Sequence, residues 1–389
     1  MRLHTNKRPL FASIGMLATV LAVAMSCQAD RGGEPAQRVL SDPILRIVDS
    51  ARWAQNAHNI QSWRLWRLDP VTVWGGLDPD RLLPATDPFD RQLILSLGAF
   101  TEAARIAART KHLNLSERWI APLDWSPTAN PGIPVFEWRF ASTMAGTEPT
   151  DETPSDVKID ALSRASVKYR VISMRLTEGF ADGAVARFDR PGLRFAIIER
   201  GPVLDQVLKP AREAYRIEMT TTTTLMESFN YTVYGARART RHPYGITLLG
   251  NFDRKSVGLF EFLAQVFPQS PAAYGRSGIE MFGKVLDHCE QAIVLTTSRN
   301  TPEAQFEAGQ ALQAMWMAAL NEGVSLLPLS QGLQEPIQYD AERQGFQTLL
   351  AENGETVQMI WAVGKPDGEF LRAPRLSANT LFVPGKPVN

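Results

Sequence analysis

The chain has 389 residues, of which 44% are hydrophobic and 21% are charged, enough for a sizeable core in one large domain or two small ones. Its 41 basic and 41 acidic residues cancel, so no overall charge favours nucleic acid or an anionic surface. The sequence has no Walker P-loop, no GxGxxG and no HExxH motif, and its five histidines lack metal-ligand spacing. These absences argue against a nucleotide triphosphatase and a zinc hydrolase.

Residues 1–27 have the pattern of an export signal. Three basic residues precede an apolar run from Pro9 to Met25, which is the order of regions in a secretory signal. A small residue stands just before Cys27, as in a bacterial lipoprotein cleavage box, and this predicts lipidation of Cys27. Residues 28–41 then form a tether. We expect an exported cell-envelope lipoprotein that touches the membrane only through this N-terminal lipid or signal anchor.

Two alternatives to lipidation stay open, because Met25 departs from the small residue usual at its place in the cleavage box. The segment can remain as an uncleaved signal anchor, or the protein can be cleaved and secreted. Lys7-Arg8 is also a degenerate match to a twin-arginine signal, which leaves the export route open.

Cys289 is the one other cysteine, so a mature exported chain has no internal disulfide. Its neighbour His288 invites a nucleophile hypothesis. Both residues lead directly into a predicted strand, however, and adjacent residues in a strand point to opposite faces. We therefore predict a buried structural cysteine.

Hydrophobic periodicity and capping residues predict a mixed α+β chain without a βαβ series long enough for a Rossmann sheet. The helix that begins at Pro302 is apolar nearly all round, which predicts burial on most sides. The predicted elements are helices at Pro43 to about Ala57, Phe89–Thr110, about Val157 to Ser166, Pro202–Thr220 and Pro302–Glu322, and strands at Trp63–Leu68, Val71–Trp74, Leu193–Glu199, Gln291–Thr297 and Val357–Val363.

A polar, proline-rich stretch from Thr143 to Asp156 is the best internal boundary in the chain. The pattern of helices and strands repeats after it. We therefore predict two similar halves, residues 42–150 and residues 151–389.

The most informative stretch is residues 51–65, where a helix-like run ends in Asn59-Ile-Gln61-Ser-Trp63 and passes into strand-like residues. The amides of Asn59 and Gln61 both donate and accept hydrogen bonds, which suits the mixed edge of a flavin or its ribityl hydroxyls. The structural alternative is that both residues cap a helix end.

Two basic segments after the internal boundary are candidate anion sites. Arg164 and Lys168 stand four residues apart and can approach the same anion, while Ser166 can donate to a phosphate or sugar oxygen. Arg372 and Arg375 supply two more guanidinium groups on a proline-stiffened segment. A solvated basic helix end is the alternative for the first cluster.

A third segment lies between these two in the sequence. The buried helix is predicted to end at Gly323, a short extended piece follows, and Pro328 to Gln331 forms a turn. Backbone N–H groups on such a turn can face the redox-active edge of a flavin.

In order and spacing, these pieces resemble the nitroreductase-like flavoproteins, specifically the Acg-type branch, over most of residues 41–385. The resemblance is carried by Asn59-x-Gln61-x-Trp63-Arg64, Asp87-Pro-Phe-Asp90-Arg91, Ser96-Leu97-Gly98-Ala99, Arg164-x-Ser166-x-Lys168, Ile293–Thr297, Ala308–Leu312, Gly323–Gln331 and Arg372-x-x-Arg375. Ordinary members are homodimers that build each FMN site from both subunits. The Acg-type branch is similar to such a dimer fused into one chain.

The resemblance implies a nitroreductase-like α+β fold with two related halves, and hence a monomer that acts as an internal pseudo-dimer with FMN as its cofactor. By the same resemblance, the FMN phosphate is held by Arg164, Lys168, Arg372 and Arg375, with Ser166 on phosphate or ribityl oxygens. Asn59 and Gln61 reach the flavin from the first half. The backbone around Ser330 and Gln331 lies by the flavin N5.

The implied activity is an FMN-dependent oxidoreductase that passes electrons from NAD(P)H or another small-molecule donor to a nitroaromatic or quinone-like acceptor, with no catalytic acid–base side chain and no nucleic-acid partner. Several departures from the family pattern matter. Gln55-Asn56-Ala57 replaces Pro-Ser-Ser, Ser62 replaces a proline, and Lys168 replaces an arginine and its bidentate fork. These departures leave open an envelope protein that binds or sequesters FMN with little turnover, and a scaffold with a decayed flavin site.

The stretch from Met226 to Ile246 is a candidate lid over the flavin, with an ordinary surface excursion as the alternative. Its basic run, Arg237–His242, is predicted to be a solvated loop.

Overall fold

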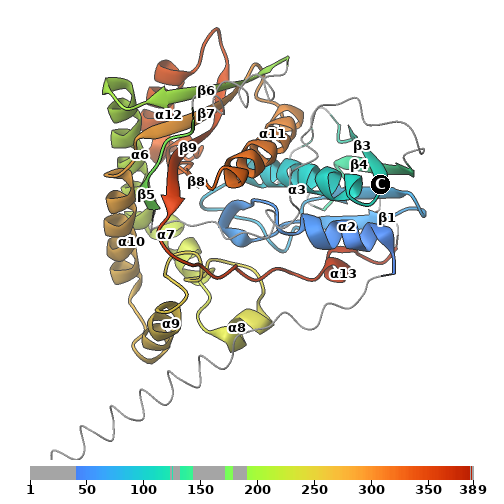
Figure 1. Cartoon of the computed structure of the whole chain (residues 1–389), viewed down its shortest axis with the longest axis horizontal. Helices are drawn as coiled ribbons and strands as arrows, with labels where there is room; N and C mark the ends of the chain where they lie inside the picture. The colour runs from blue at the N-terminus through green and yellow to red at the C-terminus, as the bar shows by residue number, and fades with distance from the viewer. Residues whose placement is uncertain are drawn as a thin grey trace, which may run out of the picture.

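The computed structural model describes residues 41–122, 125, 132–142, 171–177, 191–385 and 387. Within them the chain forms two antiparallel sheets with the long helices α3 and α11 between them (Figure 1). The predicted α+β class is confirmed. Every pairing between two named strands of the described residues is antiparallel, which agrees with the expected absence of a Rossmann sheet.

The first group of elements builds the four-stranded sheet, in the order β1-β2-β4-β3. The carboxylate of Asp69 turns the chain between β1 and β2 by accepting from the amides of Val71 and Thr72, both at 2.8 Å. This group comprises α2 (Pro43–Ala51), η1 (Ala57–Asn59), β1 (Arg64–Arg67), β2 (Thr72–Gly76), α3 (Arg91–Arg109), β3 (Leu113–Trp119) and β4 (Phe136–Ser142).

The second group builds the five-stranded sheet, in the order β5-β9-β7-β6 with β8 paired to β9. The β-branched strand β7 is buried at all of its positions, as its composition requires. This group comprises β5 (Val171–Ser173), β6 (Leu193–Glu199), α6 (Pro202–Thr220), α7 (Thr222–Asn230), α8 (Ala236–Arg241), α9 (Val257–Val266), α10 (Pro271–Leu286), β7 (Gln291–Thr297), α11 (Pro302–Asn321), β8 (Ser325–Pro328), η2 (Gln331–Leu333), η3 (Ile337–Tyr339), α12 (Asp340–Leu350) and β9 (Thr356–Pro366).

The helices α3 and α11 cross with their backbones in contact. A Cβ atom on Gly98 would lie 1.9 Å from the carbonyl oxygen of Phe306, and one on Gly309 would lie 2.0 Å from that of Leu95. Real side chains do not approach so closely, so glycine is required on both sides of the crossing. As its composition predicted, α11 is buried on most sides.

The start of α3 is joined to the second group through a buried arginine. Arg91 donates to the carbonyl oxygen of Gln358 at 2.8 Å and to that of Leu333 at 3.0 Å. The carboxylate of Asp87 accepts from the backbone amides of Gln92 and Leu93 at 3.1 and 2.9 Å, which satisfies the first turn of the helix.

The C-terminal segment returns from the second sheet to the first group of elements (Figure 1). After β9 the chain reaches α13 (Ala378–Leu381), and Val383 N donates to the carbonyl oxygen of Leu65 in β1 at 2.9 Å. Residues numbered within the predicted second half therefore pack on the predicted first half. Residues 143–156, the predicted boundary between the halves, lie outside the described residues.

Several predicted elements end elsewhere or were missed. The helix expected to reach about Ala57 ends at Ala51, and a 3₁₀ turn follows at Ala57–Asn59. The run Arg237–His242, predicted to be a solvated loop, lies largely in α8. Strands β3 and β4 and helices α7, α9, α10 and α12 were not predicted. None of the described helices is both long and apolar enough to cross a bilayer.

Gly309→Ala tests the close crossing of α3 and α11. We expect a loss of about 1–3 kcal/mol in the free energy of unfolding, because the methyl group has no room beside the Leu95 carbonyl oxygen. The measurement is denaturant unfolding of the purified protein. Gly345→Ala in α12 is the matched control, because nothing lies near its Cβ position. A loss of equal size in both variants would contradict the requirement at Gly309.

The raised pKa of Asp90 leads us to expect that the stability of the fold varies with pH. Burial, together with Asp87 and Glu335, raises the pKa of Asp90 to about 7, and burial raises that of Asp87 to about 6. The folded state therefore binds protons more tightly than the unfolded state, so stability falls as pH rises from about 4 to 7.

Asp90→Asn removes this charge and tolerates the left-handed backbone at φ 56°. We expect a gain of about 1 kcal/mol or more at pH 8 and a flatter pH profile of the midpoint of unfolding. Asp205→Asn, at an exposed position in α6, serves as the control. A pH profile identical to that of the parent protein would exclude Asp90 as the cause.

Candidate functional site

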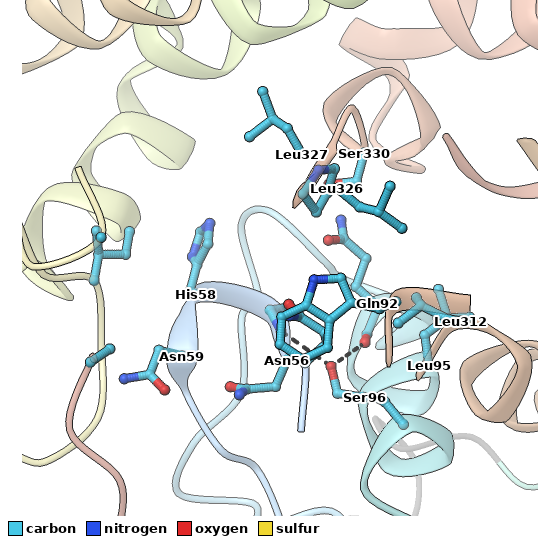
Figure 2. Close-up of a pocket in the computed structure, with 18 of the residues that line it drawn as sticks. Asn56, His58, Asn59, Gln92, Leu95, Ser96, Leu312, Leu326, Leu327 and Ser330 are labelled. Carbon is cyan, nitrogen blue, oxygen red and sulfur yellow. Dashed lines mark hydrogen bonds between the residues drawn. The ribbon is translucent and has the colours of Figure 1, made fainter. Parts of the chain in front are cut away.

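A cavity of about 210 Å³ lies where the two groups of elements meet. Figure 2 shows residues of η1 and α3, among them His58 and Ser96, facing Leu326 and Leu327 of β8. Such a volume is far larger than the roughly 10–15 Å³ that one water molecule occupies by a comparable measure. The cavity is therefore large enough for an organic ligand.

The floor of the cavity is set by strained backbone in and after η1. His58, Asn59 and Gln61 have φ angles of 48°, 52° and 52°, a region that few residues other than glycine adopt. Residues held in such conformations often mark functional sites. Ser96 of α3 supports the turn by accepting from the backbone amide of Ala57 at 3.2 Å, and its two hydrogen bonds are dashed in Figure 2.

Asn59 lines the cavity and ties three distant segments together. Its Nδ2 donates to the carbonyl oxygens of Gly245 and Pro374, both at 3.1 Å, and its Oδ1 accepts from Arg375. The structure thus brings together Asn59 and Arg375, which the sequence had singled out for one site.

Gln61 is fully buried and does not line the cavity. Its Nε2 donates to both oxygens of Asn59 at 3.2 Å and to the carbonyl oxygen of Pro243 at 2.9 Å. Its Oε1 accepts from the amide of Leu376 at 2.8 Å. The side-chain amide of Gln61, which was expected to face a ligand, is therefore hydrogen-bonded to the chain itself. Gln61 supports Asn59 on the side away from the cavity.

Arg372 and Arg375 line one end of the cavity and share an aromatic platform. Their guanidinium carbons lie 4.8 and 5.4 Å from the ring centroid of Trp53, and that of Arg52 lies 5.0 Å from it. Cations in such positions are attracted by the negative face of the ring. Arg375 is fixed further by donating to the carbonyl oxygen of Arg52 at 2.9 Å.

Of the three cations on Trp53, Arg52 is paired with Asp49 at 2.8 Å, whereas Arg372 and Arg375 have no acidic partner among the described residues. Burial and the neighbouring Arg52 lower the pKa of Arg375 to about 9, so it still carries its charge at pH 7. No carboxylate of the described residues forms an ion pair with Arg372 or Arg375. A partly buried cation without a counter-ion, such as Arg375, is costly, so a bound anion would stabilise this end of the cavity.

The turn after β8 forms another part of the wall. Ser330 and Gln331 line the cavity, and the amide of the preceding Leu329 is fixed by donating to the carbonyl oxygen of Ile360 in β9 at 2.8 Å. Gln331 Oε1 and the indole N–H of Trp316 are buried in this wall with no hydrogen-bond partner among the described residues. They are polar atoms that a ligand can satisfy.

The candidate lid lies partly against the cavity. Gly245 and Ile246 line it, and the segment is fastened to the first group of elements. Tyr231 donates its hydroxyl to the carbonyl oxygen of Leu82 at 3.1 Å, and the carboxylate of Glu227 accepts from the amides of Ala85 and Thr86, both at 2.9 Å. This part of the stretch is a wall of the site, while Arg237 and Arg241 are exposed.

The cavity includes residues that the sequence analysis did not single out. They are the large apolar or aromatic groups that close its sides: Trp53, Leu95, Leu312, Trp316, Leu326, Met359 and Trp361. Leu95 lies one turn before Gly98 on α3, and Leu312 lies one turn after Gly309 on α11, which was the available signal for these two; Leu326, Met359 and Trp361 lie on β8 and β9. Arg164, Ser166, Lys168 and Cys27 lie outside the described residues.

Cys289 is buried, as predicted, and burial raises the pKa of its thiol. Among the described residues no group of histidine, cysteine, aspartate and glutamate side chains could hold a metal ion.

No family model matches the chain. Over 335 residues it is 24% identical to a Mycobacterium tuberculosis protein provisionally named an NAD(P)H nitroreductase (MT3217 in one strain, Rv3131 in another). This alignment covers 83% of this chain and 85% of that protein. It is also 40% identical, over 73 residues, to a protein of the same species provisionally named NAD(P)H nitroreductase acg. This shorter alignment covers 19% of this chain and 22% of that protein.

Among solved structures, the chain is similar to the FMN and NADPH-dependent nitroreductase NfnB from Sphigopyxis sp. strain HMH, with 15% identity, 59% of this chain and 98% of that chain covered, and a TM-score of 0.37. An iodotyrosine deiodinase bound to FMN and 3-iodo-L-tyrosine has 12% identity, 56% and 94% coverage, and a TM-score of 0.34.

The relatives aligned over most of the chain confirm the resemblance to nitroreductase-like proteins that was found in the sequence. The Acg proteins are among its relatives, as the order of the motifs predicted.

Gln61→Glu tests the support behind Asn59. A carboxylate oxygen would replace the Nε2 donor and face the oxygens of Asn59 and Pro243, while Leu376 would keep its acceptor. We expect a loss of about 2–3 kcal/mol in stability, because buried acceptors lose their donor and a charge is buried. Thermal or denaturant unfolding measures the change. Gln269→Glu, at an exposed position, is the control, and a loss below about 0.5 kcal/mol for Gln61→Glu would exclude the support role.

Proposed function

We propose that this protein is an FMN-dependent oxidoreductase of the nitroreductase type. The observation that carries the proposal is the uncompensated pair Arg372 and Arg375, which lies over Trp53 at one end of a cavity with largely apolar walls. A phosphate beside the planar ring of a flavin has matching chemistry, because it joins a dianion to a large apolar group. The names of the relatives aligned over 83% of the chain support the same reading.

In this proposal each end of the cavity has its own task. Arg372 and Arg375 hold the phosphate, and Asn59 orients Arg375 while it faces the ligand. Arg164, Ser166 and Lys168 join the phosphate site, as the family resemblance implies. The turn at Ser330 and Gln331 faces the ring.

Bound FMN would supply the redox chemistry of its isoalloxazine ring. The chain supplies binding, orientation and exclusion of water. The side chains of Leu95, Leu312 and Leu326 form dry walls, and no acid–base side chain is required of them. The unpartnered Gln331 oxygen and Trp316 N–H offer one acceptor and one donor that fix the ligand's polar edge.

We further propose NAD(P)H or another small-molecule donor, and a nitroaromatic or quinone-like acceptor. The two halves would complete one site, so that a monomer suffices. The N-terminal signal would place the protein in the cell envelope as a lipoprotein anchored through Cys27. Mass spectrometry of the protein from bacterial membranes tests the last point, since a diacylglycerol-modified Cys27 at the N-terminus is the expected product.

The activity is tested on the purified full-length protein by absorption spectroscopy. We expect stoichiometric FMN, bleaching on anaerobic addition of NADH or NADPH, and steady turnover with a nitroaromatic or a quinone. A protein that takes up no added FMN contradicts the proposal. If FMN binds but no acceptor is reduced, whether the donor is NAD(P)H or a chemical donor of low potential, the protein sequesters FMN instead.

Arg375→Gln tests the phosphate site directly. We expect the dissociation constant for FMN to rise at least about tenfold, which is about 1.4 kcal/mol, because one charge-assisted contact is lost. Arg372→Gln, at an exposed position less embedded in the fold, should weaken binding in the same direction. Fluorescence titration with FMN measures both, and Arg276→Gln on α10 is the control. Unchanged affinity in both cavity variants, with melting as in the parent protein, would contradict the assignment.

A further inference from the structure

The helix α9 presents its apolar side chains to the outside. Five of the ten large hydrophobic residues exposed in the described part of the chain lie within nine consecutive positions of α9 and its C-cap. Their exposed fractions are 45% for Leu259, 40% for Phe260, 38% for Leu263, 50% for Val266 and 69% for Phe267. This spacing puts them on one face of a helix.

The one acidic residue of the same helix points into the protein, together with Val257. Glu261 is 5% exposed and forms an ion pair with Arg239 of α8. The side chain of Gln265, which is itself exposed, leaves no room for a Cβ atom on Gly235 at the start of α8. A water-facing helix has the opposite arrangement, so an apolar partner is needed for the outer face.

Basic residues outnumber acidic ones in the segment that contains α8 and α9. Residues 231–270 contain five arginine and lysine residues and two acidic ones, although the whole chain has a net charge of zero. Arg237, Arg241 and Lys255 are exposed, and no ion pair engages them among the described residues. In Figure 1, α8 and α9 lie together at the lower edge of the molecule, away from both sheets.

We propose that α9 is an interfacial helix that lies in the surface of an anionic lipid bilayer. An apolar face in a segment with a surplus of arginine and lysine suits such a surface, where the apolar side chains enter by about 5–10 Å and cations meet the lipid phosphates. A protein partner of ordinary composition would not require this surplus of positive charge.

The N-terminal signal provides a second argument, which rests on its proposed role as an anchor. The tether of residues 28–41 spans at most about 50 Å when extended, since each residue adds no more than about 3.6 Å. An anchored chain would therefore hold the start of the globular part within about 50 Å of the bilayer, and a contact through α9 would gain from the high effective concentration. The helix would then orient the molecule on the membrane without crossing it.

The test uses the full chain with Cys27→Ser and Phe267→Cys, labelled with an environment-sensitive NBD dye, in vesicles of phosphatidylglycerol and phosphatidylcholine. Cys289 is buried, so the label reports on position 267. We expect a blue shift of the dye emission and quenching by lipids brominated near the headgroup. Glu280→Cys on α10, whose side chain is 69% exposed, is the matched control and should keep its emission in water.

Two further experiments test whether the positive charges of the protein and the negative charges of the lipid are needed. Arg237→Glu with Arg241→Glu should abolish the shift, and so should vesicles of phosphatidylcholine alone. A dye at position 267 that stays in water on anionic vesicles overturns the proposal. A shift without vesicles that grows with protein concentration also overturns it, because a second copy of the chain would then cover α9.

Discussion

The close crossing of α3 and α11 is the constraint on which the rest of the structure depends. Gly98 and Gly309 bring the two backbones together, and Leu95 and Leu312, each three positions from its glycine, then face the same cavity. The separation of the two sheets and the width of the cavity follow from that single contact. Arg91 strengthens it from the helix start by bonding to the second sheet and to η2.

Electrostatics explains why the site is held open at one end. Arg375 is kept in place by neutral partners, the Asn59 oxygen and the Arg52 carbonyl, and by the ring of Trp53. Neutral acceptors fix a guanidinium group without cancelling its charge, so its field remains available to a ligand. Gln61 serves the same arrangement, because it holds Asn59 in a backbone conformation that asparagine tolerates better than most residues.

Much of the fold could be predicted because its signals are local. The strands Leu193–Glu199 and Gln291–Thr297 and the helix Pro202–Thr220 begin and end where predicted, since prolines and β-branched runs mark their limits. The strands β3 and β4 interleave charged residues, which hides their pattern: Glu137 pairs with Arg118 across the sheet and with Arg139 in its own strand. Most of the large apolar residues of helix α9 face outward and not into the core, so they gave no indication of a core-facing helix.

For the site, the sequence brought Asn59, Ser330, Gln331, Arg372 and Arg375 into one hypothesis, and all five line the cavity. The part played by Gln61 could not be predicted, because its partners Pro243 and Leu376 are distant in the sequence. The same holds for Trp53, whose platform exists only once the C-terminal segment has returned.

Because the C-terminal segment packs back on the first group of elements, the protein can bind a ligand at this site only late in its synthesis. Asn59 and Arg375 are separated by 316 positions, so their contact forms only after nearly the whole globular part has been made. A nascent chain that exposes the amide cluster still lacks the guanidinium groups of residues 372 and 375. Loading of any anionic ligand is therefore a late event, and an incompletely synthesised molecule is automatically unable to trap it.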